Sequence, residues 1–402
     1  MNPVLLDISR SISRAPHPVP TGIDRVERAY IEYFLNTDRQ VWFLSRIAGG
    51  FALLDKAGMA LVYPMILGDQ PWGSKDFIAR LFGRKKPEMT GRSESEIRRA
   101  SVAITGKKTL GMMLRRNLPV GFSYINIGHS NRKAGIWQAM QDGGAKRCIA
   151  MIHDVIPLDF PQYSRPDIVT RFEQELRLTA KNCDYLIYNS AHTAIRTTEW
   201  LQKWNIKTNS VTSLLGVTPL PSGFERKPAS QPYFVTLGTI EPRKNHALLL
   251  KIWQNLAKMQ PAENPLHLHI VGRRGWLNRD VFDILDQSPM MGKTVFEHNA
   301  LDDTDLSELL SGARALLFPS FAEGFGYPLV EALQKNIPVI CSNLPCFQEI
   351  SGDLPTYLNP NDEKGWENAI LGLSSSKIDV TSSNQLDFPN WPQHFLKIDT
   401  IL

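Results

Sequence analysis

The chain has 402 residues, of which 43% are apolar and 21% charged, and its formal net charge is +5. This length accommodates two domains of ordinary size, and this composition is typical of a soluble globular protein and excludes a disordered one. The first residues carry no cationic leader and no stretch of 18 apolar residues occurs, so we expect neither a signal peptide nor a membrane span. The cysteines lack CxxC pairs and an accompanying histidine cluster, which favours buried thiols in a cytoplasmic protein over disulfides or a metal site: Cys148, Cys183, Cys341 and Cys346.

Short apolar runs alternate with longer amphipathic runs along the chain. In the first half these runs predict, in order, strands and helices at Val4–Ile8, Arg25–Leu35, Val41–Ser45, Ile149–His153, Pro166–Leu178, Asp184–Asn189 and Ala191–Trp204. In the second half they predict elements at Tyr233–Leu237, Ala247–Ala257, His267–Val271, Asp305–Ser311, Ala313–Phe318 and Ile337–Cys341. This alternation predicts an α/β fold of two doubly wound, Rossmann-like parallel-sheet domains, which bind ligands outside the carboxyl ends of the strands.

A stretch rich in Pro, Gly and Ser at 219–232 separates the two halves and is typical of a linker. We therefore expect a first domain at 1–216, a hinge at 217–231 and a second domain at 232–385. Residues 386–402 end in a segment with the apolar spacing of a helix.

Several polar residues of the first half lie where predicted strands end or helices begin. Gly22 precedes a helix, where its backbone N–H could approach an anion, although an ordinary helix start also explains it. His153 and Asp154 end one strand and Asn189 and Ser190 end another, and a structural hydrogen-bonding role remains open for each. His129 is a weaker candidate for the same cleft.

Two strand-loop-helix segments of the second half are suited to a diphosphate. Gly238 ends a strand, and Arg243 and Lys244 follow just before a helix, where cations oppose the helix dipole and are better explained by an anionic ligand. Further along, Gly324-Phe325-Gly326 leads into a helix with Pro328 in its first turn, so that free backbone N–H groups form an anion seat.

Two glutamates, Glu323 and Glu331, flank this second turn at a spacing of eight positions. Carboxylates beside a phosphate would repel it unless they face neutral hydroxyls. We expect Glu323 to accept hydrogen bonds from sugar hydroxyls and Glu331 to bind a ribose diol, which together predict a nucleotide-sugar site. A strand-loop-helix with two solvated glutamates is the alternative.

These motifs resemble those of the retaining, GT-B-fold glycosyltransferases of family 4, which carry a glutamate-x7-glutamate motif and a Gly-rich strand end followed by Arg and Lys. The resemblance covers most of the chain and is most specific in GTIEPRKNH at 238–246, IVGRRGW at 270–276 and FPSFAEGFGYPLVEAL at 318–333. It is looser in TGIDRVERAYIEYF at 21–34, MIHDVIP at 151–157 and DYLIYNSAHT at 184–193. Several relatives have Gly-Arg where this chain has Gly238-Thr239, so Lys244, helped by Arg243, would carry the phosphate charge here.

The resemblance implies transfer of a sugar from a nucleoside diphosphate sugar to a hydroxyl of a glycan or lipid-linked oligosaccharide in surface polysaccharide assembly, with retention and without a metal or other cofactor. GDP-mannose is the donor of several relatives with this form of the motif. The implied catalytic residues are Glu323, Lys244, Arg243 and His153, the last facing the donor sugar. The implied donor-binding residues are Gly22, Gly238, Thr239, Gly272, Arg273, Gly324, Phe325, Gly326, Tyr327 and Glu331, with His129, Asp154, Asn189 and Ser190 on the acceptor side. In relatives the C-terminal helix crosses back onto the first domain.

Other functions remain open or lose support. A GT-B-fold epimerase or phosphorylase, or a non-catalytic nucleotide-sugar-binding subunit, would share the two-domain cleft. The chain lacks a complete dinucleotide fingerprint, a P-loop and a G-x-S-x-G elbow, which argues against hydride transfer, ATP hydrolysis and acyl transfer. A glycosidase is disfavoured because the turn between the two glutamates is suited to phosphate.

The segment 80–116 holds eleven Lys or Arg and three Glu, a net charge of +8. Such a run is often only a solvated face, and its few aromatic residues argue against nucleic acid. The functional alternative is attachment to an anionic membrane at the inner face of the cytoplasmic membrane. In that case the cations Arg84, Lys85, Lys86, Arg115 and Arg116 would contact lipid headgroups, and Leu81, Phe82, Met112, Met113 and Leu114 would enter the interface.

Overall fold

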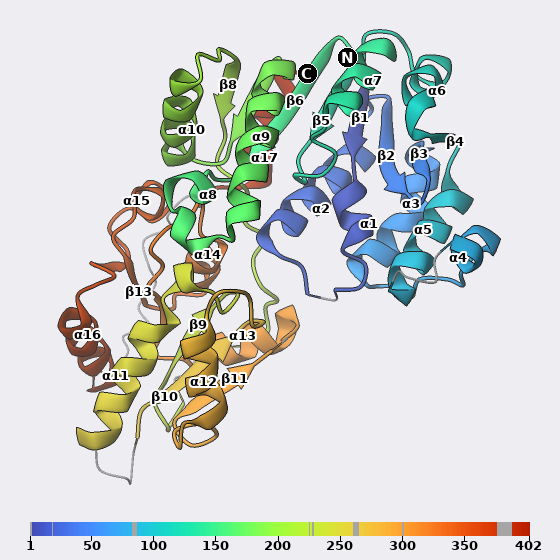
Figure 1. The fold of residues 1–402 in the computed structure, drawn as a ribbon. Helices are drawn as coiled ribbons and strands as arrows, with labels where there is room; N and C mark the ends of the chain where they lie inside the picture. Colours follow the sequence, from blue (N-terminus) through green and yellow to red (C-terminus); the bar gives the residue numbers. More distant parts are fainter. Residues whose placement is uncertain are drawn as a thin grey trace.

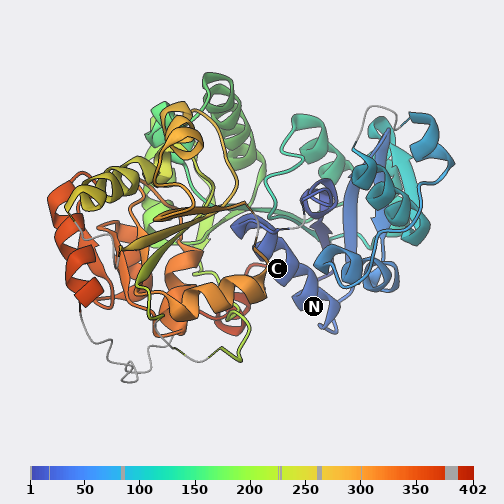
Figure 2. The ribbon, with the colours of Figure 1, turned by 90° about the horizontal axis from the view of Figure 1, so that it is seen from below.

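A computed structural model describes residues 2–17, 19–82, 87–224, 226, 229–259, 265–299, 301–375 and 388–402. Within them the chain forms two α/β domains that meet along one side (Figures 1 and 2). The expected α/β architecture of two Rossmann-like domains is confirmed.

An eight-stranded sheet, in the order β4-β3-β2-β1-β5-β6-β7-β8 among the described residues, forms the centre of the first domain. Its strands are β1 (Val4–Asp7), β2 (Val41–Ile47), β3 (Gly50–Leu54), β4 (Ala103–Gly106), β5 (Ser123–Asn126), β6 (Arg147–Ile152), β7 (Tyr185–Tyr188) and β8 (Asn209–Thr212). Its helices are α1 (Ser9–Ser13), α2 (Gly22–Leu35), α3 (Lys56–Leu67), α4 (Phe77–Phe82), α5 (Glu88–Ala100), α6 (Leu110–Asn117), α7 (Ala134–Asp142), α8 (Ile156–Asp159), α9 (Pro166–Asn182) and α10 (Ala191–Lys203), with short 3-10 turns at Lys107–Thr109 and Pro161–Tyr163.

The first sheet is parallel except at one edge. Strand β3 runs antiparallel to both β2 and β4, while the other strand pairs are parallel. The cause is a tight turn after β2, in which Gly49 has a φ of 86°, a conformation that glycine adopts without steric cost. Gly50 then lies so close to β4 that a Cβ there would be 1.8 Å from the Thr105 carbonyl oxygen.

The second domain has a six-stranded parallel sheet in the order β11-β10-β9-β12-β13-β14 within the described residues. Its strands are β9 (Tyr233–Leu237), β10 (His267–Val271), β11 (Val295–His298), β12 (Ala315–Phe318), β13 (Val339–Ser342) and β14 (Thr356–Leu358). Its helices are α11 (His246–Met259), α12 (Arg279–Gln287), α13 (Asp303–Gly312), α14 (Tyr327–Gln334), α15 (Pro345–Ser351) and α16 (Glu363–Ser375), with a 3-10 turn at Pro242–Lys244. The strand order reverses between β9 and β12, which is where open α/β sheets bind ligands.

The last helix, α17 (Trp391–Asp399), follows the second domain in the chain but packs on the first. The Phe395 ring stacks on Tyr33 of α2 at a centroid distance of 3.8 Å, and His394 Nε2 lies 2.8 Å from the Tyr30 hydroxyl. Beyond α17, the Leu402 carbonyl oxygen accepts a hydrogen bond of 2.7 Å from Asn2 Nδ2, so that the two chain ends lie side by side (Figure 1).

The basic segment 80–116 covers α4, α5, β4 and α6, at the end of the first domain farthest from the second (Figure 1). Met113 and Leu114 are buried, so the expectation that they could enter a membrane interface is wrong, whereas Leu81 and Met112 are exposed. Helix periodicity is the reason, since Leu110, Met113 and Leu114 share the inward face of α6. Arg84, Lys85 and Lys86 and the Phe82 side chain lie outside the described residues.

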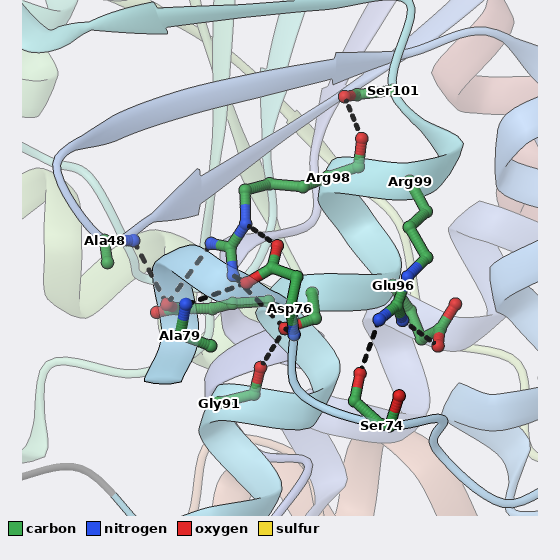
Figure 3. Close-up of polar contacts among 11 residues, drawn as sticks. Ala48, Ser74, Asp76, Ala79, Gly91, Glu96, Arg98, Arg99 and Ser101 are labelled. Atoms are coloured by element: carbon green, nitrogen blue, oxygen red, sulfur yellow. Dashed lines mark hydrogen bonds and ion pairs between the residues drawn. The ribbon is translucent and has the colours of Figure 1, made fainter. Parts of the chain in front are cut away.

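The arginines at the end of α5 are paired with carboxylates within the domain (Figure 3). Arg98 is buried and donates to Asp76 at 2.5 and 2.8 Å, while Arg99 donates to Glu96 at 2.5 Å. The pairing with Arg98 lowers the pKa of Asp76 to about 2. Asp76 also accepts from the Ala79 backbone N–H at 2.7 Å, so this cluster fixes α4 against α5. Arg98 is therefore a structural cation and not part of a lipid-facing surface.

In the part of the chain that the structure describes, no helix combines the length and apolar character that a bilayer span requires.

Candidate active site

Two helix N-termini, one from each domain, face each other where the domains meet. Helix α2 begins at Gly22 and α14 begins at Tyr327, and a Cβ at Gly22 would lie 3.2 Å from the Tyr327 ring. Gly326 caps α14 with a φ of 117°, and Pro328 occupies its first turn. Unpaired N–H groups and helix dipoles at this junction favour an anion. Gly22 and Gly326, both donor-site candidates, are therefore brought together.

Glu323 lies at the centre of a buried charge cluster in front of α14. Its carboxylate accepts from Lys244 Nζ at 2.6 Å and lies 2.8 Å from Arg243 Nη1, and the Ser320 hydroxyl donates to it at 2.7 Å. Burial alone would raise the pKa of Glu323, yet Arg243 and Lys244 lower it to about 2. The glutamate is thus ionised at any physiological pH, and the two phosphate-site cations lie within reach of the sugar-site carboxylate.

Glu241 belongs to the same cluster although no role was predicted for it. It is buried and lies 2.7 Å from Arg243 Nη2. Arg243 also donates to the Ala322 carbonyl oxygen at 2.7 Å, which joins the loop after β9 to the loop after β12. Neighbouring carboxylates raise the pKa of Arg243, whereas burial lowers the pKa of Lys244. Arg243 thus has Glu241, Glu323 and the Ala322 carbonyl oxygen as partners, while the ion pair of Lys244 is with Glu323.

Glycines bring the loops after β9 and β10 into contact. Gly238 has a φ of 138° and Gly272 a φ of 155°, and a Cβ at Gly272 would lie 1.9 Å from the Gly238 carbonyl oxygen. Thr239 lies in the same loop contact, since a Cβ at Gly275 would be 2.7 Å from its methyl group. Arg273, predicted to bind the donor, donates instead to His17 Nδ1 of the first domain at 2.9 Å.

Glu331 lies one turn inside α14 and is only 4% exposed. Burial raises its pKa, and the nearest cation is Arg25 of α2, whose Nη1 lies 3.2 Å from Glu331 Oε1. Arg25 Nη2 also lies 2.6 Å from Asp303 at the start of α13. The two glutamates of the motif thus have different partners: Glu323 pairs within its own domain and Glu331 pairs across the domain boundary.

The first-domain candidates lie against the loop that carries Glu323. A Cβ at Gly324 would be 2.1 Å from the His153 carbonyl oxygen, so only glycine permits this approach. Ser190 donates to the Gly324 carbonyl oxygen at 2.9 Å, and Asn189 donates to that of His153 at 2.8 Å. Both side chains are buried, and the Ser190 hydroxyl also lies 3.0 Å from the Thr193 hydroxyl.

His153 and His129 lie together with ring centroids 4.9 Å apart. His153 Nε2 lies 2.9 Å from the Ile127 carbonyl oxygen, and burial lowers the His153 pKa to about 3, so this imidazole is neutral. Burial also lowers the pKa of His129. Asp154, the next residue, has its pKa raised by burial and lowered by Arg243.

Phe325 and Tyr327 fix the loop between the two domains. Phe325 is buried in a core cluster otherwise made mostly of first-domain residues, and the Tyr327 hydroxyl donates to the Gly216 carbonyl oxygen at 3.3 Å. Among the described residues, no group of three or more His, Cys, Asp and Glu side chains is arranged to hold a metal ion.

Part of the chain that carries this site matches a known protein family. Residues 222–381 match the family model of glycosyl transferases group 1, and this range contains Arg243, Lys244, Glu323 and Glu331.

The similarity to curated relatives extends beyond residues 222–381. A serotype-specific mannosyltransferase, WbdA, of Escherichia coli is 33% identical over 276 residues, which cover 63% of this chain and 33% of the relative. The O-antigen chain mannosyltransferase RfbU of Salmonella typhimurium is 28% identical over 60% of this chain and 66% of its own length. The chain thus spans only about a third of the length of the WbdA relatives.

Solved structures match the whole two-domain arrangement. A sucrose-phosphate synthase from Thermosynechococcus elongatus superposes with a TM-score of 0.56 over 93% of this chain and 90% of that structure, at 16% identity. The lipopolysaccharide outer core galactosyltransferase WaaB superposes with a TM-score of 0.53 over the full length of both chains, at 14% identity. At these identities the likeness concerns the fold, which is the expected GT-B architecture.

Arg25, Glu241 and Asp303 are charged residues of this site to which the sequence analysis assigned no role. Arg25 lies in the motif TGIDRVERAYIEYF. Its position could have been found from the sequence, because it is a cation at the fourth residue of a helix that begins at the predicted site. Glu241 directly precedes Pro242-Arg243-Lys244, where an acidic residue beside two cations suggests an ion pair.

Proposed function

We propose that this protein is a retaining, metal-independent glycosyltransferase that transfers a hexose from a nucleoside diphosphate sugar, with GDP-mannose as the first donor to test, to a hydroxyl of a growing surface glycan. One observation carries the proposal: Glu323 is held by Lys244 and Arg243 directly before helix α14, opposite the N-terminus of α2. The mannosyltransferase names of the similar O-antigen proteins support the choice of donor.

The diphosphate would lie between the two helix N-termini. Its negative charge competes with Glu323 for the two cations, so Lys244 can turn to the phosphate while Glu323 accepts hydrogen bonds from the sugar hydroxyls. Glu331 would accept the hydroxyls of the ribose. His153, being neutral, can bond the donor sugar without adding a positive charge beside the reacting carbon.

The reaction follows from where charge develops. As the bond between sugar C1 and the leaving phosphate oxygen breaks, negative charge grows on that phosphate, where Lys244, Arg243 and the N–H groups of Gly22 and Gly326 stabilise it. The acceptor oxygen then forms its bond to C1 on the face that the phosphate leaves, and its proton passes to the departing phosphate. No metal enters this scheme, because the positive charge on the phosphate side comes from the protein.

The test is direct. The purified chain is incubated with each of several nucleotide sugars, with and without a lipid-linked glycan extract, and with a chelator in parallel. We expect thermal stabilisation by one nucleotide class, transfer that needs acceptor and survives the chelator, and an α-linked product from an α-linked donor. Stabilisation by no nucleotide sugar would overturn the proposal, product from donor alone would indicate an epimerase, and binding without transfer would indicate a non-catalytic subunit.

We further propose that the first domain contacts an anionic membrane surface at the cytoplasmic face. The exposed residues at its far end include apolar side chains, cations and the acidic Glu88. Apolar side chains are exposed on α4, β4 and α6, including Phe77, Ile78, Leu81, Ile104 and Met112. Cations are exposed beside them, including Arg80, Lys107, Lys108 and Arg116. This mixture is typical of a surface that enters the headgroup region, and it would hold the cleft near a lipid-linked acceptor.

A further inference from the structure

Arg25 is the cation that links the two domains at the predicted ribose position. Its guanidinium reaches from α2 of the first domain to Glu331 on α14, at 3.2 Å, and to Asp303 on α13, at 2.6 Å. A crevice of about 220 Å³ opens beside it, and its lining includes Arg25, Asp303 and Tyr327. Three elements from two domains therefore meet at one positive charge.

The charge balance at this point depends on Arg25. The titratable groups that face Glu331 are Arg25 from α2, Asp303 from α13 and Tyr327 from its own helix. Burial raises the pKa of Glu331, Asp303 raises it further, and Arg25 opposes both. Within this group Arg25 thus favours the ionised carboxylate.

An ionised carboxylate is the form that can accept hydrogen bonds from both hydroxyls of a ribose. A carboxylate offers about four acceptor positions, so a contact between Arg25 and Oε1 leaves others for a ligand. A protonated Glu331 would donate one bond and lose part of this capacity. Because Arg25 belongs to the first domain, Glu331 can be held ionised for ribose binding only when the first domain lies against the second.

We propose that Arg25 is a positioning residue of the donor site, which holds Glu331 ionised and oriented for the nucleotide ribose when the domains are together. This inference rests on the proposed function, since it assigns the group that Glu331 binds. Arg25 acts through Glu331 and not on the reacting atoms.

The experiment measures the affinity for GDP and UDP by calorimetry between pH 6 and pH 9, for the full chain and its Arg25→Ala variant. At neutral pH we expect the substitution to weaken binding about 10- to 100-fold, as for loss of a charged hydrogen-bond partner. The variant should regain affinity as the pH rises, because its Glu331 ionises only at higher pH. The unsubstituted chain should change little over this range.

Three further variants separate positioning from structural support. Arg25→Lys should restore part of the affinity and of the flat pH profile. In a Glu331→Gln background, Arg25→Ala should have little further effect and no pH dependence. Arg92→Ala removes the same charge on α5, at the far end of the first domain, where the guanidinium pairs with Glu88, and should change affinity no more than about two- to threefold.

The outcomes are distinguishable. An Arg25→Ala variant that binds as tightly as the unsubstituted chain, or more weakly with an unshifted pH profile, would overturn the role of Arg25. If the unsubstituted chain binds neither nucleotide, the proposed function itself fails.

Discussion

Lys244 donates a hydrogen bond of 2.6 Å to Glu323, so a cation suited to phosphate and a carboxylate suited to sugar hydroxyls satisfy each other. Both side chains are about 10% exposed, and neither could stay charged at this depth without a partner. Donor binding would therefore exchange one ion pair for two ligand contacts and would leave no buried charge unpaired.

Replacement of Lys244 by Ala should lower turnover roughly 10²- to 10³-fold. The lost contact strengthens as the leaving phosphate gains charge, and loss of one such donor typically has an effect of this size. Single-turnover kinetics at saturating donor measure the effect. Lys251→Ala is the matched control, because Lys251 is an exposed cation on α11 whose partner is the half-buried Glu363. Near-normal turnover of Lys244→Ala would remove it from this role.

The two glutamates should be separable by ligand choice. Glu331→Ala should weaken binding of the free nucleoside diphosphate and of the sugar donor alike, because both contain the ribose. Glu323→Ala should weaken donor binding and turnover while free nucleoside diphosphate binds almost as before. Calorimetry with both ligands on both variants tests this, and equal losses for the free nucleotide would contradict the assignment.

Donor binding should draw the two domains together. They already touch through Trp276, which donates to the Tyr163 carbonyl oxygen at 3.0 Å, and through Arg273 and His17. A site between domains closes to exclude the water that would hydrolyse the donor. Solution scattering should give a smaller radius of gyration with saturating nucleotide than without it. A Glu331→Ala sample at the same nucleotide concentration serves as control, and an unchanged radius in the unsubstituted chain would count against closure.

Binding to anionic vesicles should depend on the exposed cations of α6 and of the 3-10 turn that precedes it. Sedimentation with anionic vesicles should be strong at low salt, fall at high salt, and fail when Lys107, Lys108 and Arg116 become Ser. Arg115 is kept, because it donates to the Asp142 carbonyl oxygen. Substitution of three exposed lysines elsewhere on the first domain, Lys146, Lys181 and Lys207, is the control. Binding that ignores both lipid charge and these substitutions would exclude the proposal.

The fold should lose stability as the pH falls below about 6.5, with a contribution from His153. Burial lowers the pKa of His153 from 6.5 to about 3, so in this range the unfolded chain binds the proton more readily than the folded protein. The free energy of unfolding should therefore fall by about 2 kcal/mol between pH 7 and pH 5 from this group. Urea unfolding at the two pH values measures it, and His153→Gln should show a correspondingly smaller loss. An equal loss in the variant would show that the folded protein does not lower the pKa of His153.

Local patterns predicted most of the strands at the centre of each sheet, but they missed β5, which lies between β1 and β6, and the side-chain contacts between the domains. Continuous apolar runs identified β9 and β10 with their observed bounds, and Pro328 after a glycine turn identified the start of α14. Strand β8 was missed because its residues are half-buried or exposed and lack an apolar run. The pair Arg25–Asp303 joins residues 278 positions apart, and no periodicity within either segment contains that information. The helical spacing of Leu110, Met113 and Leu114 indicates a buried face of α6. Met113 and Leu114 were assigned to a membrane surface because the positive charge of the segment was considered without this spacing.

The return of α17 to the first domain means that this domain is built from two separate stretches of chain. Phe395, Ile398, Ile401 and Leu402 are part of the same buried cluster as Val4 and Leu6 of β1. Synthesis of residues 1–216 therefore leaves an apolar face on α2 uncovered until the whole second domain has been made. During translation the second domain can fold from contiguous sequence while the first, although made earlier, is completed later. Cleavage of the chain between the second domain and α17 should therefore destabilise the first domain, although the cut lies far from it in the sequence.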